Sequence, residues 1–231
     1  MTKDVQWDEK TADAEVNHFR DAQTKNNNDN WKERPFDFPT QLTTLLKDGM
    51  DVLDVGAGPV SLFEKWKEKN IHVTATDILA EKYAKLRDEL GYEADIETLF
   101  CPGECLSELF GIESFDVSFT RNALDHCIDP KEVVDQMMAV LRPGGFLHIQ
   151  TFFNEGAGSK YQNMHQWNLW IDKNVLWLCG KDKSNKTNLT EHIEKQNMKP
   201  LCLDTSVGKH SRQIIAIFQK EGSYQNDTET I

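Results

Sequence analysis

Apolar runs alternate with amphipathic stretches through the middle of the chain. Four runs have the length and composition of buried strands: 51–55, 71–76, 115–119 and 145–151. Three stretches between them carry apolar residues at helical spacing: 59–69, 80–90 and 131–141. Strands separated by helices of about ten residues indicate βαβ units, and therefore a mostly parallel, doubly wound sheet.

Towards the C-terminus the pattern changes. Residues 199–206 and 211–220 predict two strands joined by a short linker, which would form an antiparallel hairpin that closes the sheet. Before them, segment 154–188 is rich in Trp, Asn and Gln, and is expected as an insertion beside the carboxyl ends of the strands. Its apolar residues recur at helical spacing and predict an amphipathic helix on the sheet: Trp167, Trp170, Ile171, Val175 and Leu178.

The two ends of the chain are polar. Residues 1–40 contain one helical stretch, from about 8 to 24, and are expected as an arm that either frays or forms a lid over a site. We expect the main domain at 41–220 and a flexible tail at 221–231.

Composition narrows the class of protein. The 231 residues suit one large domain, and the 39% that are hydrophobic suffice for a core. The 26 Lys and Arg against 38 Asp and Glu give a net charge of −12, which disfavours a nucleic-acid partner. No apolar run approaches the roughly 20 residues of a membrane-spanning helix. The N-terminus lacks the apolar core of a signal peptide. We therefore expect a cytoplasmic protein that acts on a small molecule, and nothing indicates its oligomeric state.

A glycine turn follows the first predicted strand. Ligands bind beyond the carboxyl ends of strands in such sheets, and Gly56-Ala57-Gly58 allows close approach of the backbone. A helix starting near Pro59 would present free N–H groups. Asp77 ends the second strand, where its carboxylate can accept hydrogen bonds from ribose hydroxyls. These features predict a nucleoside site; a tight turn beside a solvated acid is the alternative.

Two residues favour S-adenosylmethionine over a dinucleotide. A dinucleotide fingerprint reads Gly-x-Gly-x-x-Gly, whereas Ser61 occupies the third glycine position. Asp54 precedes the first glycine, and an acid there suits a cofactor with a cationic amino-acid end. S-adenosylmethionine carries a positive ammonium and a positive sulfonium, and its product would be S-adenosylhomocysteine.

Several separated segments between about residues 50 and 151 resemble the class I S-adenosylmethionine-dependent methyltransferases of the small-molecule type. They are Val52-Leu-Asp-Val-Gly-Ala-Gly58, Thr76-Asp77-Ile78, Pro102-Gly-Glu-Cys105, the stretch 115–130 and Leu141-Arg-Pro-Gly-Gly-Phe146. The resemblance implies an α/β fold with a doubly wound, mostly parallel, seven-stranded Rossmann-like sheet and a C-terminal antiparallel hairpin. The chain departs from the family at Pro59-Val60, where a third glycine is common.

The same resemblance implies roles for single residues. Asp77 would hold the ribose, and Ile78 would pack on the adenine. Glu104 and the backbone of Cys105 would meet the adenine amino group. Asn122 would touch the methionine part or the acceptor, with a helix N-cap as its alternative role. The glycine turn and its preceding acid complete the cofactor-binding set: Asp54, Gly56, Ala57 and Gly58.

Two histidines are candidates for the base that takes the acceptor's proton. His126 lies in the turn after the 115–119 strand, which faces the methyl group in the resembled family, and His165 lies in the insertion. Histidine titrates near neutral pH, which suits this task; a capping or packing role is the alternative for each. Asp125 and Asp129 flank His126, but Asp129-Pro130 is typical of a helix N-cap, so no metal site is expected.

The insertion also bears on the acceptor. If its tryptophans faced the site beside His165, they would suit a polar ring such as a sugar. We therefore interpret the chain as a methyltransferase that moves a methyl group to an oxygen of a sugar-like or other small metabolite. A non-catalytic methyltransferase-like binding protein is the first alternative, although Asp54, Gly56 and Asp77 are all intact. A nicotinamide-dependent oxidoreductase is the second.

Overall fold

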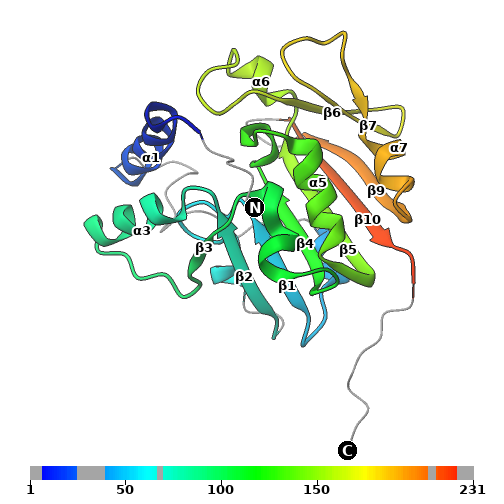
Figure 1. The fold of residues 1–231 in the computed structure, drawn as a ribbon, viewed down its shortest axis with the longest axis horizontal. Helices are drawn as coiled ribbons and strands as arrows, with labels where there is room; N and C mark the ends of the chain where they lie inside the picture. The colour runs from blue at the N-terminus through cyan, green and yellow to red at the C-terminus, as the bar shows by residue number, and fades with distance from the viewer. Residues whose placement is uncertain (1–6, 25–39, 67–69, 208–211, 223–231) are drawn as a thin grey trace, which may run out of the picture.

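The computed structural model describes residues 7–24, 40–66, 70–207 and 212–222. Seven strands form the main sheet: β1 (Asp51–Val55), β2 (His72–Asp77), β3 (Thr98–Phe100), β4 (Phe115–Arg121), β5 (Leu141–Phe152), β9 (Met198–Val207) and β10 (Arg212–Lys220). Their order is β3-β2-β1-β4-β5-β10-β9 (Figure 1). The first five strands are parallel, whereas β10 runs antiparallel to β5 and β9. The fold class predicted from the sequence is confirmed.

The direction of winding reverses at β1. From β1 the chain builds β2 and β3 on one side, and then returns to build β4 and β5 on the other. The carboxyl ends of β1 and β4 therefore flank the switch point, where doubly wound sheets bind their ligands.

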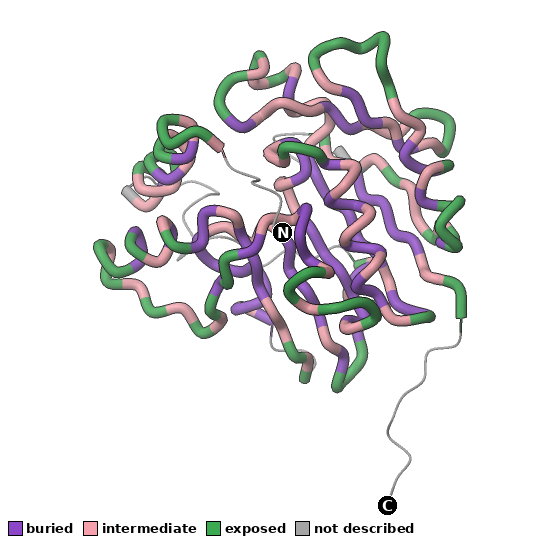
Figure 2. The backbone as a smooth tube through the Cα atoms, viewed as in Figure 1, coloured by how far each residue is buried: buried purple, intermediate pink, exposed green. Residues whose placement is uncertain are grey.

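Helices cover the sheet and its edges. They are α1 (Glu9–Thr24), α2 (Thr40–Leu45), α3 (Ala80–Glu89), α4 (Leu106–Phe110), α5 (Pro130–Ala139), α6 (Glu155–Gly158) and α7 (Leu189–Glu194), with 3₁₀ turns η1 (Leu62–Lys65), η2 (Gly103–Cys105) and η3 (Leu124–His126). Successive residues of a strand face opposite sides of the sheet. Accordingly, Val52 belongs to a core cluster with Leu42 of α2, and Leu53 to one with Val133 of α5. Figure 2 shows this burial concentrated along the central strands.

The predicted helix over 59–69 is wrong. Only the single turn η1 forms there, and residues 67–69 lie outside the described part of the chain. Side chains of this segment bond to its neighbours: Ser61 Oγ donates to Asp54 Oδ2 at 2.7 Å. The Glu64 carboxylate accepts from the Tyr92 hydroxyl and from the Ile96 N–H. These contacts hold the segment against the sheet and the 91–97 loop in a path that a continuous helix would not follow.

The predicted amphipathic helix in the insertion is also wrong. The segment folds as a three-stranded antiparallel sheet of β6 (Asn168–Asp172), β7 (Val175–Cys179) and β8 (Thr187–Asn188). Lys173 and Asn174 have φ angles of 49° and 59°, as a two-residue type I′ hairpin turn requires. Leu169 and Leu178 pair across the hairpin and are buried, while Trp170 and Trp177 pair on the other face. The apolar residues therefore follow the two-residue period of strands.

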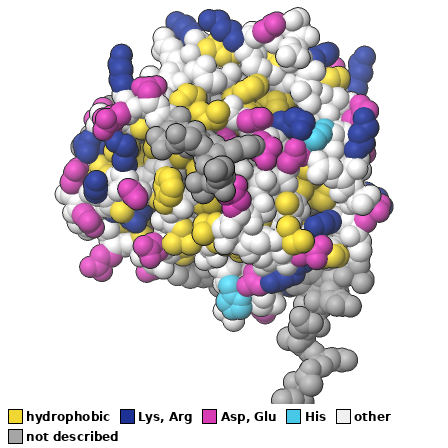
Figure 3. Space-filling view, viewed as in Figure 1, with side chains coloured by type: hydrophobic (Ala, Val, Ile, Leu, Met, Phe, Trp, Pro, Cys, Tyr) yellow, Lys and Arg dark blue, Asp and Glu magenta, His cyan; other side chains and the backbone are white. Residues whose placement is uncertain are grey.

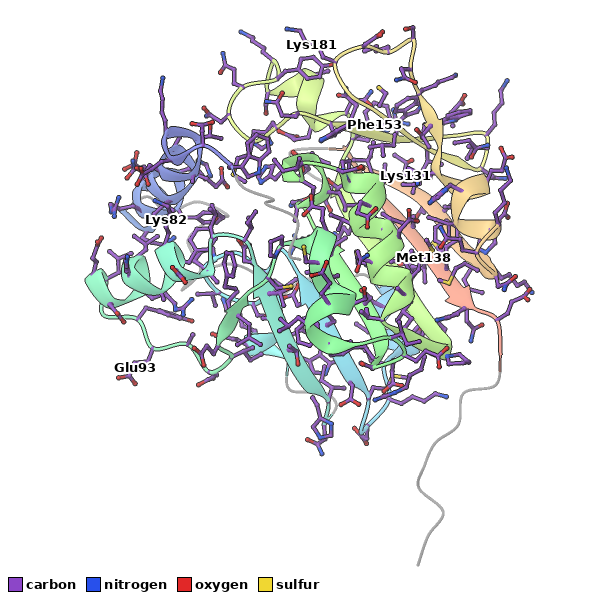
Figure 4. The ribbon with its side chains drawn as sticks, viewed as in Figure 1. Lys82, Glu93, Lys131, Met138, Phe153 and Lys181 are labelled. Carbon is purple, nitrogen blue, oxygen red and sulfur yellow. The ribbon has the colours of Figure 1, made fainter. Side chains whose placement is uncertain are left out.

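At the N-terminal end, α1 coincides with the predicted helical stretch and lies beside α3 (Figure 1). Lys82 of α3, labelled in Figure 4, donates to Asp13 of α1 at 2.7 Å. Most of the rest of the predicted arm (residues 1–6 and 25–39), residues 208–211 of the hairpin and nearly all of the predicted tail lie outside the described residues. Figure 3 shows acidic and basic side chains interspersed over one face of the molecule. Among the described helices, none combines the length and apolar character needed to cross a membrane.

Candidate active site

A cavity of about 370 Å³ opens at the carboxyl ends of β1, β2 and β4. It brings together residues that are distant in sequence. All the predicted site residues except Cys105 line it: Asp54, Gly56, Ala57, Gly58, Asp77, Ile78, Glu104, Asn122, His126 and His165. The switch point of the sheet and the predicted chemistry therefore coincide.

The glycine turn bonds to β2 through its own N–H groups. The Gly56 and Ala57 N–H groups donate to Thr76 O at 2.9 and 3.0 Å, and the Gly58 N–H donates to Asp77 Oδ2 at 3.0 Å. The helix expected to begin near Pro59 and to offer free N–H groups does not form, because only the 3₁₀ turn η1 follows the glycine turn. A pyrophosphate needs such donors, so this turn suits a cofactor without phosphates better than a dinucleotide.

Asp77 is held in a fixed orientation at the end of β2. Besides its bond from Gly58, its Oδ1 accepts from the Leu79 N–H at 2.7 Å. Burial raises the pKa of Asp77 to about 6, although these two backbone bonds oppose the rise. Each carboxylate oxygen has further lone-pair capacity, so hydroxyl donors from a ligand can still bind the ionised form.

Glu104 and Cys105 have different places in the site. Glu104 lines the cavity, and its Oε1 accepts from the N–H groups of Ile128 and Asp129 at 3.0 and 3.1 Å. This ties η2 to the loop that follows η3. The Cys105 side chain belongs to the main core cluster, and its N–H donates to Pro102 O at 2.9 Å. The geometry therefore does not support a cofactor contact by Cys105.

Asn122 is built into the turn after β4 in an unusual backbone conformation. Its φ is 53°, and its N–H donates to Gln150 O at 2.9 Å. Ala123, rather than Asn122, stands at the N-cap position of η3. Among the described residues, the Asn122 Oδ1 atom is buried without a hydrogen-bond partner. A buried unpaired acceptor in a cavity wall is a natural contact for a ligand N–H group.

The second half of the site is a cluster of Asp125, His126 and His165, which we call the His–His–Asp cluster. His165 Nδ1 lies 2.7 Å from Asp125 Oδ2 and 2.9 Å from His126 Nε2. Asp125 Oδ2 and His126 Nε2 are 3.4 Å apart. Asp125 is 1% exposed. Burial lowers the pKa of His165, but the hydrogen bond and charge of Asp125 outweigh it, so the net shift is upward.

Backbone and indole contacts position this cluster. The Gln166 N–H donates to Asp125 O at 2.9 Å, and Trp167 Nε1 donates to Cys127 O at the same distance, which pins the His165 loop onto η3. On the opposite side, Trp7 Nε1 donates to His126 O at 2.8 Å. The two histidines, 39 positions apart in sequence, are thus held edge to face with ring centroids 4.3 Å apart.

Facing an acceptor was the alternative role for the tryptophans of the insertion, and they lie outside the cavity lining. Trp170 and Trp177 instead stack on each other, with ring centroids 6.2 Å apart. Other residues of the cavity wall were not predicted from the sequence, namely Glu15 and Phe19 of α1, Arg121 at the end of β4, Phe152 and Glu155. The helical stretch was predicted, but no local signal shows which of its faces meets the cavity.

Comparison with known proteins agrees with this architecture. Residues 53–149 match the family model of a methyltransferase domain. Phosphoethanolamine N-methyltransferase 2 of Caenorhabditis elegans is 26% identical over 67% of this chain and 35% of its own length. Malonyl-[acyl-carrier protein] O-methyltransferase of Salmonella typhimurium is 30% identical over 48% of this chain and 43% of its own length. The chain therefore spans less than half of either relative.

Among solved structures, the N-methyltransferase NodS of Bradyrhizobium japonicum, bound to S-adenosylhomocysteine, has a similar fold. The TM-score is 0.57 at 15% identity, over 91% of this chain and 98% of that protein. This likeness concerns the fold. The matched methyltransferase domain covers β1 to β5, the part of the sheet that contains the switch point.

Proposed function

We propose that this protein transfers a methyl group from S-adenosylmethionine to an oxygen atom of a small polar acceptor. One observation carries the proposal: a single cavity is lined both by the glycine turn with Asp77 and by the His–His–Asp cluster. A nucleoside-binding end and a polar end with proton-accepting groups are the two parts that such a transfer requires.

The residues of the cavity suit this cofactor. Asp77 would accept from the ribose hydroxyls, and Ile78 supplies an apolar wall for the adenine. Asp54 is 2% exposed and would face the cationic amino-acid end. Bound there, S-adenosylmethionine supplies a methyl group on a positively charged sulfur, which keeps the electron pair of the broken bond and leaves as S-adenosylhomocysteine. The engaged N–H groups of the glycine turn count against the nicotinamide alternative.

The chain's own residues then have three tasks. They align the acceptor oxygen, exclude water, and assist the loss of the hydroxyl proton. The His–His–Asp cluster meets the third task, because Asp125, His126 and His165 converge on one point of the cavity wall. Arg121 and Glu155 add charged groups to the same cavity. These polar groups support a hydrophilic acceptor, and the stacked tryptophans of the insertion take no part in its binding.

α1 serves as the cover of the cavity. Glu15 and Phe19 of this helix line it, and Trp7 just before the helix bonds to the backbone of His126. Phe19 also packs edge to face on Tyr83 of α3, with ring centroids 5.6 Å apart. The N-terminal arm thus contacts both the cofactor end and the acceptor end.

The test is a transfer assay with isotopically labelled S-adenosylmethionine and a panel of sugars, polyols, hydroxy acids and amines. We expect formation of S-adenosylhomocysteine and of an O-methylated product with at least one hydroxylated compound. His165→Ala is expected to slow transfer by about 10²-fold or more, with cofactor affinity unchanged. Methylation of amines alone would contradict the oxygen acceptor. Cofactor binding without any transfer would favour the non-catalytic alternative.

A further inference from the structure

We propose that the His–His–Asp cluster is a binding site for a divalent transition-metal ion. The ligand atoms are Asp125 Oδ2, His126 Nε2 and His165 Nδ1. From the sequence, the only metal arrangement considered was Asp125 and Asp129 around His126. In the structure Asp129 caps α5 by accepting from the Lys131 and Glu132 N–H groups, and His165 completes the cluster instead.

The three ligand atoms form a triangle of metal-site dimensions. Its edges are 2.7, 2.9 and 3.4 Å. Metal–ligand bonds of about 2.1 Å give neighbouring ligand atoms about 3.0 Å apart in an octahedron and about 3.4 Å apart in a tetrahedron. Two of the three edges lie closer to the octahedral value than to the tetrahedral one, so the triangle fits one face of an octahedron, and all three ligand residues line the cavity.

One proton does not satisfy all three ligand atoms. If His165 Nδ1 carries a proton, it can share that proton between Asp125 Oδ2 and His126 Nε2, but the lone pairs of these two acceptors then face each other at 3.4 Å. If His126 Nε2 instead donates to His165 Nδ1, no proton lies between His165 Nδ1 and Asp125 Oδ2. An oxygen of the carboxylate then lies 2.7 Å from a nitrogen that offers it no hydrogen. A proton satisfies one or two contacts, whereas a cation between the atoms satisfies every lone pair at once.

The surroundings are those of a metal centre. Ligating histidines commonly turn their other ring nitrogen towards a carboxylate. His126 Nδ1 faces Glu15 of α1, whose Oε1 is 4.0 Å away, and the Glu15 side chain is only 12% exposed. The carboxylates of Asp125 and Glu15 together balance two positive charges. This keeps the site compatible with the positively charged cofactor expected in the same cavity.

Two imidazoles and one carboxylate favour Fe²⁺, Mn²⁺, Co²⁺ or Zn²⁺ over Mg²⁺, which prefers oxygen ligands. The catalytic consequence rests on the proposed function. An acceptor hydroxyl bound to the open position of the metal loses its proton to solvent more readily, and its oxygen then attacks the methyl group. The metal thus selects acceptors whose hydroxyl can coordinate it.

The test uses the full chain, stripped with a chelator and titrated with Co²⁺ by calorimetry and visible absorption. We expect one Co²⁺ per chain, with ligand-field bands that identify nitrogen and oxygen ligands. Asp125→Asn and His165→Gln should each weaken Co²⁺ binding by about 100-fold or more. The matched control is His192→Gln, because His192 also bonds a carboxylate, that of Asp135, outside the cavity lining. It should bind Co²⁺ as the unaltered protein does.

S-adenosylhomocysteine affinity, measured on the same samples, separates this inference from the proposed function. Absence of stoichiometric Co²⁺ binding to a protein that binds S-adenosylhomocysteine overturns the metal site alone. Equal loss of Co²⁺ binding in His192→Gln also overturns it, because the effect would then not belong to the cluster. Co²⁺ binding that depends on Asp125 and His165 supports the site, even if S-adenosylhomocysteine fails to bind and the proposed function falls.

Discussion

Gly56 shows how one residue sets the shape of the site. Its φ is +70°, a region that favours glycine, and a Cβ added there would lie 2.3 Å from Ala123 Cβ. The turn after β1 and the turn after β4 therefore pack against each other at a point where only a glycine fits. This close approach brings the cofactor end of the cavity next to the turn that carries Asn122 and the His–His–Asp cluster.

Gly56→Ala should lower the free energy of unfolding by about 2–4 kcal/mol, as backbone strain adds to overlap with Ala123. Gly49→Ala is the matched control, because Gly49 has φ +81° but nothing within 4 Å of the added Cβ. It should cost about 1 kcal/mol, from backbone strain alone. Urea unfolding measures both values. Equal costs would mean that the two turns do not touch in the folded protein.

His148, in β5, makes the free energy of unfolding depend on pH. It has no exposed surface and lies against Phe119, with ring centroids 5.0 Å apart. Burial, and then the charge of Arg121, lowers the pKa of His148 from 6.5 to about 3. Below about pH 6.5 the unfolded chain takes up a proton here that the folded protein refuses. The contribution of His148 to stability is therefore lost as the pH falls from 6.5 towards 3.

His148→Phe should remove this part of the acid sensitivity. Between pH 7 and about pH 4.5, the variant should lose about 2–3 kcal/mol less unfolding free energy than the unaltered protein. The control is His72→Gln, since the His72 side chain is 67% exposed and should show no such difference. Urea titrations at the two pH values give the answer. If the unaltered protein and His148→Phe lost the same unfolding free energy between the two pH values, His148 would not be buried in its neutral form.

At the residue scale, the sequence predicts which side chains lie at the cavity better than it predicts which of them contact one another. Four predicted residues line the cavity because each lies at the carboxyl end of a strand or in a turn beside it: Asp54, Asp77, Glu104 and His126. The contact of His165 with Asp125 spans 40 positions and depends on how the insertion folds. No local pattern encodes that contact, so the cluster emerges only in three dimensions.

At the scale of elements, α1 is the part of the arm whose role is most testable. Phe19→Ala should weaken S-adenosylhomocysteine binding by about tenfold, because a cavity wall of large apolar area is removed. Arg20→Ala is the matched control on the same helix, since Arg20 pairs with Glu89 on the surface. It should leave the affinity within about twofold. Calorimetry measures the S-adenosylhomocysteine affinity of both variants. Equal losses of affinity would contradict the role of α1 as a cover of the cavity.

The β6–β7 hairpin offers a second test at this scale. Its turn residues, Lys173 and Asn174, both have positive φ, which Asn-Gly adopts with less strain. The double change Lys173→Asn with Asn174→Gly should raise the free energy of unfolding by about 0.5–1 kcal/mol. Urea unfolding measures it. A clear loss of stability would mean that the segment does not turn at these residues.

Elements with a single dominant signal were predicted well from the sequence. The apolar runs predicted as strands all form strands, namely β1, β2, β4 and β5, and α5 begins after the Asp129-Pro130 cap. The two wrongly predicted helices have different causes. In one segment the apolar residues fit both a helical and a strand period, and in the other the polar side chains bond to residues outside the segment. In the insertion a tight turn converts an apparent helical spacing into two strands. After the glycine turn, Ser61 and Glu64 bond to neighbouring parts of the chain.

At the scale of the whole molecule, the topology of the sheet determines the position of the cavity. A sheet that reverses its winding at β1 presents the carboxyl ends of β1, β2 and β4 to a single cavity. The same cavity receives α1 from one side and the His165 loop from the other. The fold thus places the groups proposed to bind the cofactor and the acceptor in one space, although they come from α1, the main sheet and the insertion.

The most direct test of this relation is thermal unfolding with S-adenosylmethionine, S-adenosylhomocysteine and NAD⁺ in parallel. A ligand at about a hundred times its dissociation constant stabilises a protein by roughly 2.7 kcal/mol, a readily visible shift. We expect the two adenosyl-sulfur ligands to raise the unfolding temperature and NAD⁺ to leave it unchanged. Asp77→Asn should fold but lose the shift. A rise with NAD⁺ alone, or no rise with any of the three, would contradict the assignment of this cavity to S-adenosylmethionine.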